Sequence, residues 1–188
     1  MMRLIRLLSP LLCAVALAVT PAAASVAAPA TAVTSPDIPT QQAAMDRLSF
    51  MVGNWVGSGW TITASGTRQE FLQTERVRRQ VQGLVISVEG LGRDKADPTR
   101  IVDSALAVIN YDDTTSQYRW EAFSQGHLTA SVPVVGDDTF QWTLSQPGVT
   151  IRYTLKFTRT SWHEVGELST DGGQSWRKNF QMDLTRLR

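Results

Sequence analysis

The chain has 188 residues, 43% of them hydrophobic, and its 18 basic and 17 acidic residues nearly cancel. This balance, with no basic tract beyond Arg76 to Arg79, excludes nucleic acid as an expected partner. One cysteine cannot form a disulfide within the chain, which excludes a small disulfide-stapled extracellular domain.

The N-terminal residues have the pattern of a Sec-type signal peptide. Arg3 and Arg6 form a basic region, Leu7 to Val19 is almost wholly apolar, and small residues follow from Pro21 to Ala24. We therefore predict a signal peptide over residues 1–24, with cleavage after Ala27 as the alternative, and a periplasmic or secreted protein. The apolar run is shorter than the ~20 residues of a spanning helix, so no stable membrane anchor is expected after cleavage.

The rest of the chain divides into a leader and one domain. Residues 25–38 are rich in Ala, Ser, Thr, Val and Pro and predict a flexible leader, whereas residues 39–188 are long enough for a single domain with a sizeable core. Cys13 lies in the middle of the apolar run, not at its end, so lipidation is not expected and Cys13 leaves with the signal.

One helix is expected, over Gln41 to Met51. Apolar residues recur there at spacings of three and four, Thr40 is a candidate N-cap, and Gly53 ends the pattern. We expect this helix to plug or flank one end of a barrel.

Ten runs after the helix alternate between apolar and polar residues, which is typical of strands with one dry face. Short gaps of turn-forming residues separate them, as antiparallel hairpins require, although residues 94–100 form a looser and more charged loop. The fold predicted is all-β, a ten-stranded up-and-down antiparallel barrel with a short N-terminal helix; a sandwich is the alternative. The predicted strands are Trp55–Ala64, Arg68–Val81, Leu84–Arg93, Ser104–Tyr111, Gln117–Ser124, His127–Val134, Thr139–Ser145, Val149–Thr158, Trp162–Ser169 and Trp176–Thr185.

The dry faces of these strands carry many aromatic rings. A small barrel either fills itself with such rings or uses them to line a pocket, and the alternation does not decide between the two. The candidate ligand-binding residues are Phe71, Tyr118, Trp120, Trp142, Tyr153 and Phe157.

Gly53-Asn54-Trp55 opens the first strand, where Gly53 lets the chain turn steeply and Trp55 can close the barrel floor. Together with Tyr111-Asp112 and a C-terminal hairpin that ends near Arg186, this pattern resembles the bacterial domain family DUF1579 over residues 46–188. The resemblance implies a calycin-type barrel, related to lipocalin-like and nitrobindin-like proteins, that binds a small apolar molecule. Gly53 and Trp55 would then be structural.

Nitrobindin-like proteins hold haem through a histidine on a strand near the C-terminus. This chain has no histidine after His163, and its last strand offers Gln181, Asp183 and Thr185 instead. We therefore expect no cofactor. His127 and His163 are far apart, with no cysteine beside them, so no metal site is expected either.

Residues 169–176, Ser-Thr-Asp-Gly-Gly-Gln-Ser-Trp, match the Asp-box pattern at every fixed position. The carboxylate of Asp171 can accept backbone N–H groups, Gly173 permits positive φ, and Trp176 packs beneath the turn. A single copy in a short chain predicts a rigid hairpin and not a sialidase-like propeller.

Several charged residues leave an enzyme open as an alternative. By parity Glu75 lies on the opposite face of its strand from Arg76 and Arg78, so one set could point inward, although a solvated outer face is expected. Glu164 and Glu167 have no partner at a readable spacing. An enzyme acting inside the barrel would need an inward carboxylate or histidine, for which the candidates are Glu75, Glu121, His127 and His163.

The leading hypothesis is an exported barrel that binds a small hydrophobic or amphipathic molecule in its interior, with no catalytic residue assigned. The alternatives are a small lyase, isomerase or hydrolase, and an envelope interaction module with a filled barrel and a functional outer surface. The identity of the ligand does not follow from the sequence.

Overall fold

The computed structural model describes residues 35–188, so the predicted signal peptide and most of the predicted leader lie outside the described residues. Within that range the chain forms a short helix, two 3₁₀ turns (Ser49–Met51 and Val81–Gly83) and eleven strands. The elements are α1 (Ile38–Asp46), β1 (Gly53–Ile62), β2 (Arg68–Gln80), β3 (Val85–Asp94), β4 (Ile101–Asp112), β5 (Gln117–Ser124), β6 (His127–Ser131), β7 (Val134–Val135), β8 (Thr139–Gln146), β9 (Val149–Phe157), β10 (Ser161–Ser169) and β11 (Arg177–Arg186).

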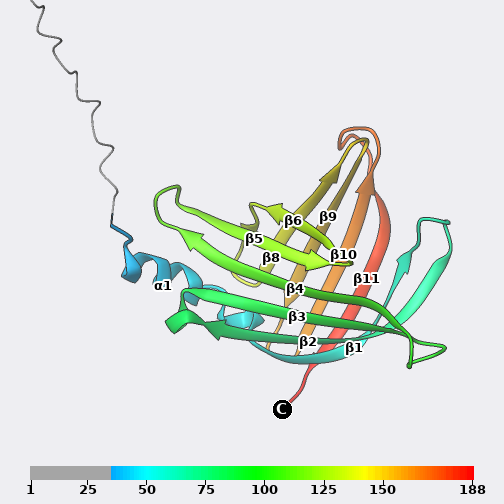
Figure 1. The fold of residues 1–188 in the computed structure, drawn as a ribbon, viewed down its shortest axis with the longest axis horizontal. Coiled ribbons are helices and arrows are strands. Elements are labelled where there is room, and N and C mark those ends of the chain that lie inside the picture. The colour runs from blue at the N-terminus through cyan, green and yellow to red at the C-terminus, as the bar shows by residue number, and fades with distance from the viewer. Residues whose placement is uncertain (1–34) are drawn as a thin grey trace, which may run out of the picture. The chain divides into compact units, whose positions relative to one another are not determined.

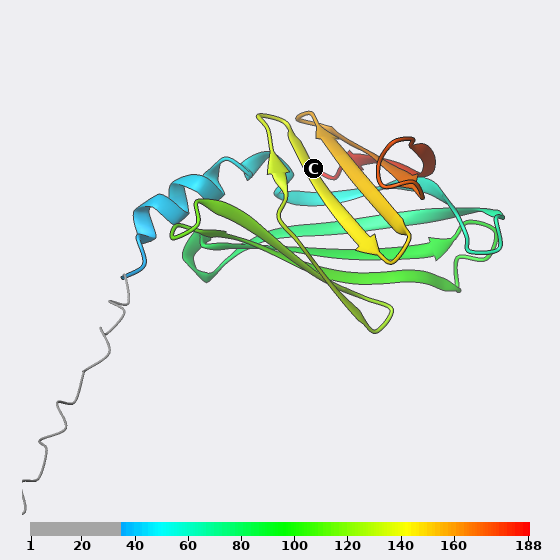
Figure 2. The same ribbon diagram turned by 90° about the horizontal axis from the view of Figure 1, so that it is seen from above.

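All eleven strands belong to one antiparallel sheet in the order β6-β5-β4-β3-β2-β1-β11-β10-β9-β8-β7. The first and last strands meet in the middle of this order, where Trp55 of β1 lies opposite Arg186 of β11. The sheet curls so that strands β1 to β4 cross over strands β8 to β11 (Figures 1 and 2). The predicted all-β, up-and-down barrel fold is confirmed, with eleven strands in place of ten.

The additional strand arises at Pro133. The run His127–Val134 was predicted as one strand, but it forms β6 and the two-residue β7, because Pro133 has no N–H with which to continue a ladder. In the described residues β6 and β7 are the two ends of the sheet and are not paired with each other. We call the boundary between these two ends of the sheet the seam. Across it, the backbone N–H of Thr143 donates to Ser131 Oγ at 3.2 Å.

The helix begins earlier and ends earlier than predicted. Asp37, and not Thr40, is the N-cap: its carboxylate accepts the backbone N–H of Thr40 at 3.1 Å, and Pro39 suits the first turn. Met45, Leu48 and Met51, whose spacing predicted the helix, are fully buried, but Met51 lies in the 3₁₀ turn that leads to β1. No helix within residues 35–188 is long and apolar enough to cross a membrane.

Trp55 and Arg186 join the two ends of the domain. Trp55 is buried, its indole N–H donates to the Met51 carbonyl at 2.9 Å, and its ring packs edge-on against Phe157 and Trp162. Arg186 lies over the other side of the ring and donates to the carbonyls of Phe50 and Val52. A Cβ at Gly53 would lie 2.5 Å from this guanidinium, which is why the position needs glycine.

The Asp-box residues form the turn between β10 and β11. Asp171 Oδ1 accepts the Ser175 N–H at 3.0 Å and the Ser169 hydroxyl at 2.8 Å, while the Trp176 indole donates to the Gly173 carbonyl at 3.0 Å. Hydrogen bonds from Ser175 and Ser169 hold the pKa of Asp171 well below its usual range. This geometry is that of a rigid hairpin.

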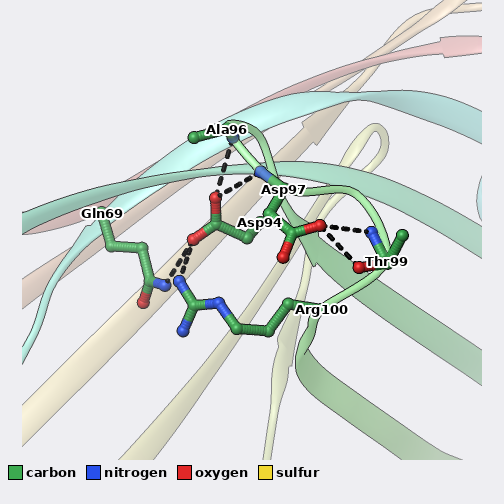
Figure 3. A network of polar contacts seen from close by, with 6 residues as sticks. All are labelled: Gln69, Asp94, Ala96, Asp97, Thr99 and Arg100. Atoms are coloured by element: carbon green, nitrogen blue, oxygen red, sulfur yellow. Dashed lines mark hydrogen bonds and ion pairs between the residues drawn. The ribbon is translucent and has the colours of Figure 1, made fainter.

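The loop between β3 and β4, expected to be the loosest, is held by Asp94 (Figure 3). One carboxylate oxygen of Asp94 accepts the backbone N–H groups of Ala96 (2.8 Å) and Asp97 (3.1 Å), and the other accepts Gln69 and pairs with Arg100. These hydrogen bonds, the largest from the Asp97 backbone, lower the pKa of Asp94 to about 2. The charged residues of this loop therefore hold it in place.

Candidate binding site on the concave face

The curled sheet has an inner side, here called the concave face, on which the dry positions of the strands converge. Six aromatic side chains lie on it in a continuous series of ring contacts, with centroid distances between 4.3 and 5.7 Å. We call this series the aromatic ladder. Its members, in order of contact, are Phe140, Trp120, Trp142, Tyr153, Phe180 and Phe71.

The ladder connects the two halves of the sheet. Trp120 of β5 contacts Trp142 of β8 across the seam, and Phe71 of β2 contacts Phe180 of β11. Trp142 and Tyr153 are stacked at 4.3 Å with an angle of 11° between their planes, and both remain partly exposed. A flat apolar group can therefore meet aromatic faces here.

Four of the six predicted ligand-binding residues belong to the ladder: Phe71, Trp120, Trp142 and Tyr153. The other two lie at the helix end of the domain. The Tyr118 hydroxyl donates to the Ala44 carbonyl of α1 at 2.7 Å, and Phe157 packs against Trp162 and Phe50. The structure therefore places Tyr118 and Phe157 in the packing between helix and sheet, away from the ladder.

Two glutamates are buried among the inner-face residues. Glu75 of β2 and Glu164 of β10 are 8% and 6% exposed. Glu75 was expected on a solvated outer face, but alternation along β2 buries Phe71, Gln73, Glu75 and Val77 and exposes Thr74 and Arg76. The same alternation along β10 buries Glu164 together with Trp162 and Gly166. This parity is the signal that could have found both carboxyl groups.

Burial raises the pKa of Glu75 from the usual 4.5 to about 7, against the effect of Gln73 Nε2, which donates to Glu75 Oε1 at 2.7 Å. Burial likewise raises the pKa of Glu164 to about 8. Because Glu75 ionises first, its charge adds to the rise at Glu164. The Trp162 indole lies close enough to lower the pKa of Glu164 slightly, although its geometry falls short of a hydrogen bond.

Small residues opposite Glu75 make room for it. Gly90 lies beside Glu75 in the register of β2 and β3, and a Cβ there would be 2.8 Å from Glu75 Oε1. A Cβ at Gly92 would be 2.9 Å from Gln73 Oε1. The wall formed by β3 therefore accepts these two polar side chains only because it carries glycines.

The other predicted acid–base candidates are exposed. Glu121 lies on the outer face of β5, and His163 is bonded through Nδ1 to Asp183 Oδ1 on the outer face at 2.6 Å. His127 is exposed at the start of β6. The register Ala122↔Thr129 turns the polar residues of β6 inward and exposes Leu128, the reverse of what apolar alternation suggests.

These positions do not fit a haem held by an interior histidine, because His163 is engaged on the outer face and β11 carries no histidine. No group of three His, Cys, Asp or Glu side chains within residues 35–188 is arranged to hold a metal ion.

The described structure has two recesses. One, of about 650 Å³, follows mainly outward-facing residues of β1 to β4 around Arg76 and Arg78, although Glu75 and Gly90 also line it. The other, of about 760 Å³, lies between the β1–β2 turn and the β3–β4 loop. The concave face is thus not identified by an enclosed void. Its distinguishing features are the ladder and the buried carboxyl groups.

Comparison with solved structures finds neighbours with a similar fold. The fold resembles that of lipocalin-like and calycin-like β-barrels. Rv2717c from M. tuberculosis is similar with a TM-score of 0.59 and 14% identity, over 77% of this chain and 98% of that one. The S-type phycobiliprotein lyase CPES from Guillardia theta is similar with a TM-score of 0.54 and 10% identity, over 78% and 92%.

Comparison by sequence finds no match. No protein-family model and no curated protein matches the chain. The resemblance to DUF1579 therefore stays a prediction, whereas the lipocalin-like β-barrel fold that it implied is shown by the structural neighbours.

Proposed function

We propose that this protein is an exported carrier that binds a small amphipathic molecule against the concave face. The observation that carries the proposal is the presence, on one face, of partly exposed aromatic rings and buried polar atoms without partners. Within residues 35–188, neither Glu75 Oε2 nor the indole N–H of Trp120 has a hydrogen-bond partner. Buried polar atoms are nearly always paired, so these two are suited to the polar end of a ligand.

The seam supports access to this face. Trp120 lies opposite Ser131, and the Ser131 hydroxyl also accepts the N–H of Thr143, the neighbour of Trp142. Among the described residues, parting β6 from β8 would break this one hydrogen bond and no backbone ladder, and it would separate Trp120 from Phe140 and Trp142. Regions with few backbone hydrogen bonds open at the least free energy, so entry along the seam leads directly to the ladder.

The fold supports the proposal more generally. The S-type phycobiliprotein lyase CPES has a similar fold, so a sheet curled in this way also occurs in a lyase. Export is the other part of the proposal, and it depends on the N-terminal pattern of the sequence alone.

Fluorescence titration tests the proposal. The probe is N-phenyl-1-naphthylamine, an uncharged molecule that fluoresces in apolar surroundings, added to residues 25–188. We expect saturable binding and an affinity about tenfold lower in Trp142→Leu, because the main stacking surface is lost. Trp60→Leu is the matched control, since Trp60 packs against Arg68 on the outer face. Absent or unsaturable binding, or equal loss in both variants, would overturn the proposal.

An acid–base enzyme is the second candidate, because Glu75 and Glu164 have raised pKa values on one concave face. One of the two could hold a proton at neutral pH while the other accepts one. If residues 25–188 chemically convert a bound molecule, Glu164→Gln should abolish conversion and preserve binding of the uncharged N-phenyl-1-naphthylamine. Turnover that persists in Glu164→Gln would exclude this role.

An interaction module is the third. Leu106, Phe123 and Leu128 are cross-strand neighbours on the outer face and are 43%, 57% and 57% exposed. Self-association that is lost in Phe123→Ser would support this reading, and a concentration-independent monomer would count against it.

A further inference from the structure

The carboxyl groups of the concave face lack cationic partners. None of the ion pairs formed by residues 35–188 includes Glu75, Glu164 or Asp103. Asp103 Oδ1 accepts only the Ser124 hydroxyl, at 2.8 Å, and Glu75 only the amide of Gln73. Buried carboxyl groups in proteins are normally paired with a cation, so this arrangement is costly in the free protein.

A second observation is independent of the acidic cluster and points to a ligand. Trp120 is 7% exposed, and its indole N–H donates to no group among the described residues. Trp120 belongs to the ladder and contacts Phe140 and Trp142. A polar donor is thus left unpaired on the same face as the unpaired oxygen of Glu75.

Aromatic faces and carboxyl groups meet at Tyr153. Tyr153 pairs with Gly166 in the register of β9 and β10, and Glu164 lies two residues from Gly166 on the same face. Burial, and then the charges of Glu164 and Asp103, raise the pKa of Tyr153 above its usual range. The same ring stacks on Trp142. A cation placed here would meet carboxylates on one side and the negative faces of aromatic rings on the other.

We propose that the ligand is an amphipathic amine, whose ammonium group binds at Glu75 and Glu164 while its apolar body lies along Trp142 and Tyr153. This inference rests on the proposed binding function and names its ligand class. A ligand with a carboxylate would instead add negative charge to a face that already carries three acidic side chains. A neutral alcohol would satisfy Glu75 Oε2 but would leave the charge of the cluster uncompensated.

Calorimetric titration of residues 25–188 with octylamine, octan-1-ol and octanoate tests the inference, because the three probes share one apolar chain. At about pH 8, we expect octylamine to bind at least about tenfold more tightly than octan-1-ol, and octanoate to bind most weakly. Glu75→Gln and Glu164→Gln should each weaken octylamine about tenfold and change octan-1-ol less than about threefold. Glu121→Gln, which removes an exposed carboxylate of β5, is the control and should change neither.

The pH dependence gives a second readout on the unmodified protein. Gln73, Asp103 and Tyr153 lie beside the cluster, and none of them supplies a positive charge. His127, which is exposed, pairs in register with Ser124, the hydroxyl donor to Asp103. Octylamine keeps its charge up to about pH 10, whereas Glu75 and Glu164 lose their protons between about pH 6 and 9. Octylamine affinity should therefore rise across that interval, while octan-1-ol affinity stays level.

The outcomes separate the two proposals. If octan-1-ol binds as tightly as octylamine, or if both glutamine variants bind octylamine like the unmodified protein, the amine inference fails and the binding function stands. If none of the three probes binds and the fluorescent probe fails as well, the binding function itself fails. Glutamine has the shape of glutamate, so folding should persist; should one variant not fold, the other and the pH series decide.

Discussion

The guanidinium group of Arg186, the last residue of β11, lies 4.0 Å from the ring centre of Trp55, near the start of β1. It also donates to the carbonyls of Phe50 and Arg159, so one side chain joins the end of the domain to its beginning and to the β9–β10 turn. The two strands also pair along their length, from Trp55↔Arg186 to Thr61↔Phe180. This contact holds the helix end of the domain, on which the packing of α1 depends.

Arg186→Ala should lower the free energy of unfolding by roughly 2 to 3 kcal/mol, because it removes a stacked cation and leaves several carbonyls without donors. Arg188→Ala, which removes an exposed arginine two residues later, is the control and should change little. Urea denaturation followed by tryptophan fluorescence measures both. Equal stability of the two variants would show that the contact is incidental.

Gly173→Ala should destabilise the protein by about 1 to 2 kcal/mol. Gly173 has φ +91°, and a Cβ there would lie 3.5 Å from Trp176 Cζ2. Thr170→Ala, at an exposed position of the same turn, is the control. The measurement is urea denaturation, and an unchanged midpoint for Gly173→Ala would contradict the rigid Asp-box turn.

Asp94→Ala should open the β3–β4 loop to trypsin, which cleaves after Lys95 and Arg100. The Asp94 carboxylate holds the N–H groups of Ala96 and Asp97, and its loss frees both. Asp137→Ala, in the exposed turn before β8, should leave cleavage after Lys95 and Arg100 unchanged. Slow cleavage of Asp94→Ala would mean that other contacts hold the loop.

The pKa of Asp94 is lowered on folding. The stabilisation that Asp94 provides is therefore present above about pH 4 and is lost as the pH falls toward 2.

Glu164 should make the protein less stable as the pH rises. Its pKa is raised in the folded state, so between about pH 4.5 and 8 the native protein keeps a proton that the unfolded chain has released. The stabilisation that Glu164 provides is therefore complete below pH 4.5 and is lost as the pH rises through 8. Over this interval the free energy of unfolding falls by up to about 1.4 kcal/mol per pH unit.

Glu164→Gln should flatten this slope and raise stability at about pH 8, since the buried charge is gone. Glu121→Gln should keep the slope of the unmodified protein. Denaturation at a series of pH values measures all three. Glu75, whose pKa is raised to about 7, keeps a slope below that pH in every variant. A slope that survives between about pH 7 and 8 in Glu164→Gln would assign the titration to another group.

The ladder was predictable from alternation because each of its members occupies a dry position with period two. Trp142, Tyr153 and Phe180 are examples, and the strand register then brings them together. Helix and strand boundaries were less predictable. Pro133 divides one apolar run in two, and Asp37 caps the helix earlier than Thr40 would, because backbone geometry and not hydropathy decides these ends.

The burial of Glu164 could be read from the parity of its strand, but its place in a site with Glu75 could not. A single glutamate in an alternating strand looks like an outer-face residue unless the parity of Trp162 and Gly166 is given precedence over its charge. Glu164 and Glu75 come onto the same face of the sheet through pairing of strands about 90 residues apart, by way of β11 and β1. Local sequence patterns do not contain this long-range pairing. The resemblance to calycin-type barrels supplied the curled sheet but not its acidic interior.

The most direct test of ligand binding on the concave face is a titration of ¹⁵N-labelled protein with N-phenyl-1-naphthylamine, followed through the tryptophan indole N–H resonances. The resonances of Trp120 and Trp142 should shift progressively and saturate together. Those of Trp60, on the outer face, and Trp176, at the Asp-box turn, should stay in place. Shifts confined to Trp60 and Trp176, or no shift at any indole, would show that the concave face does not bind the probe.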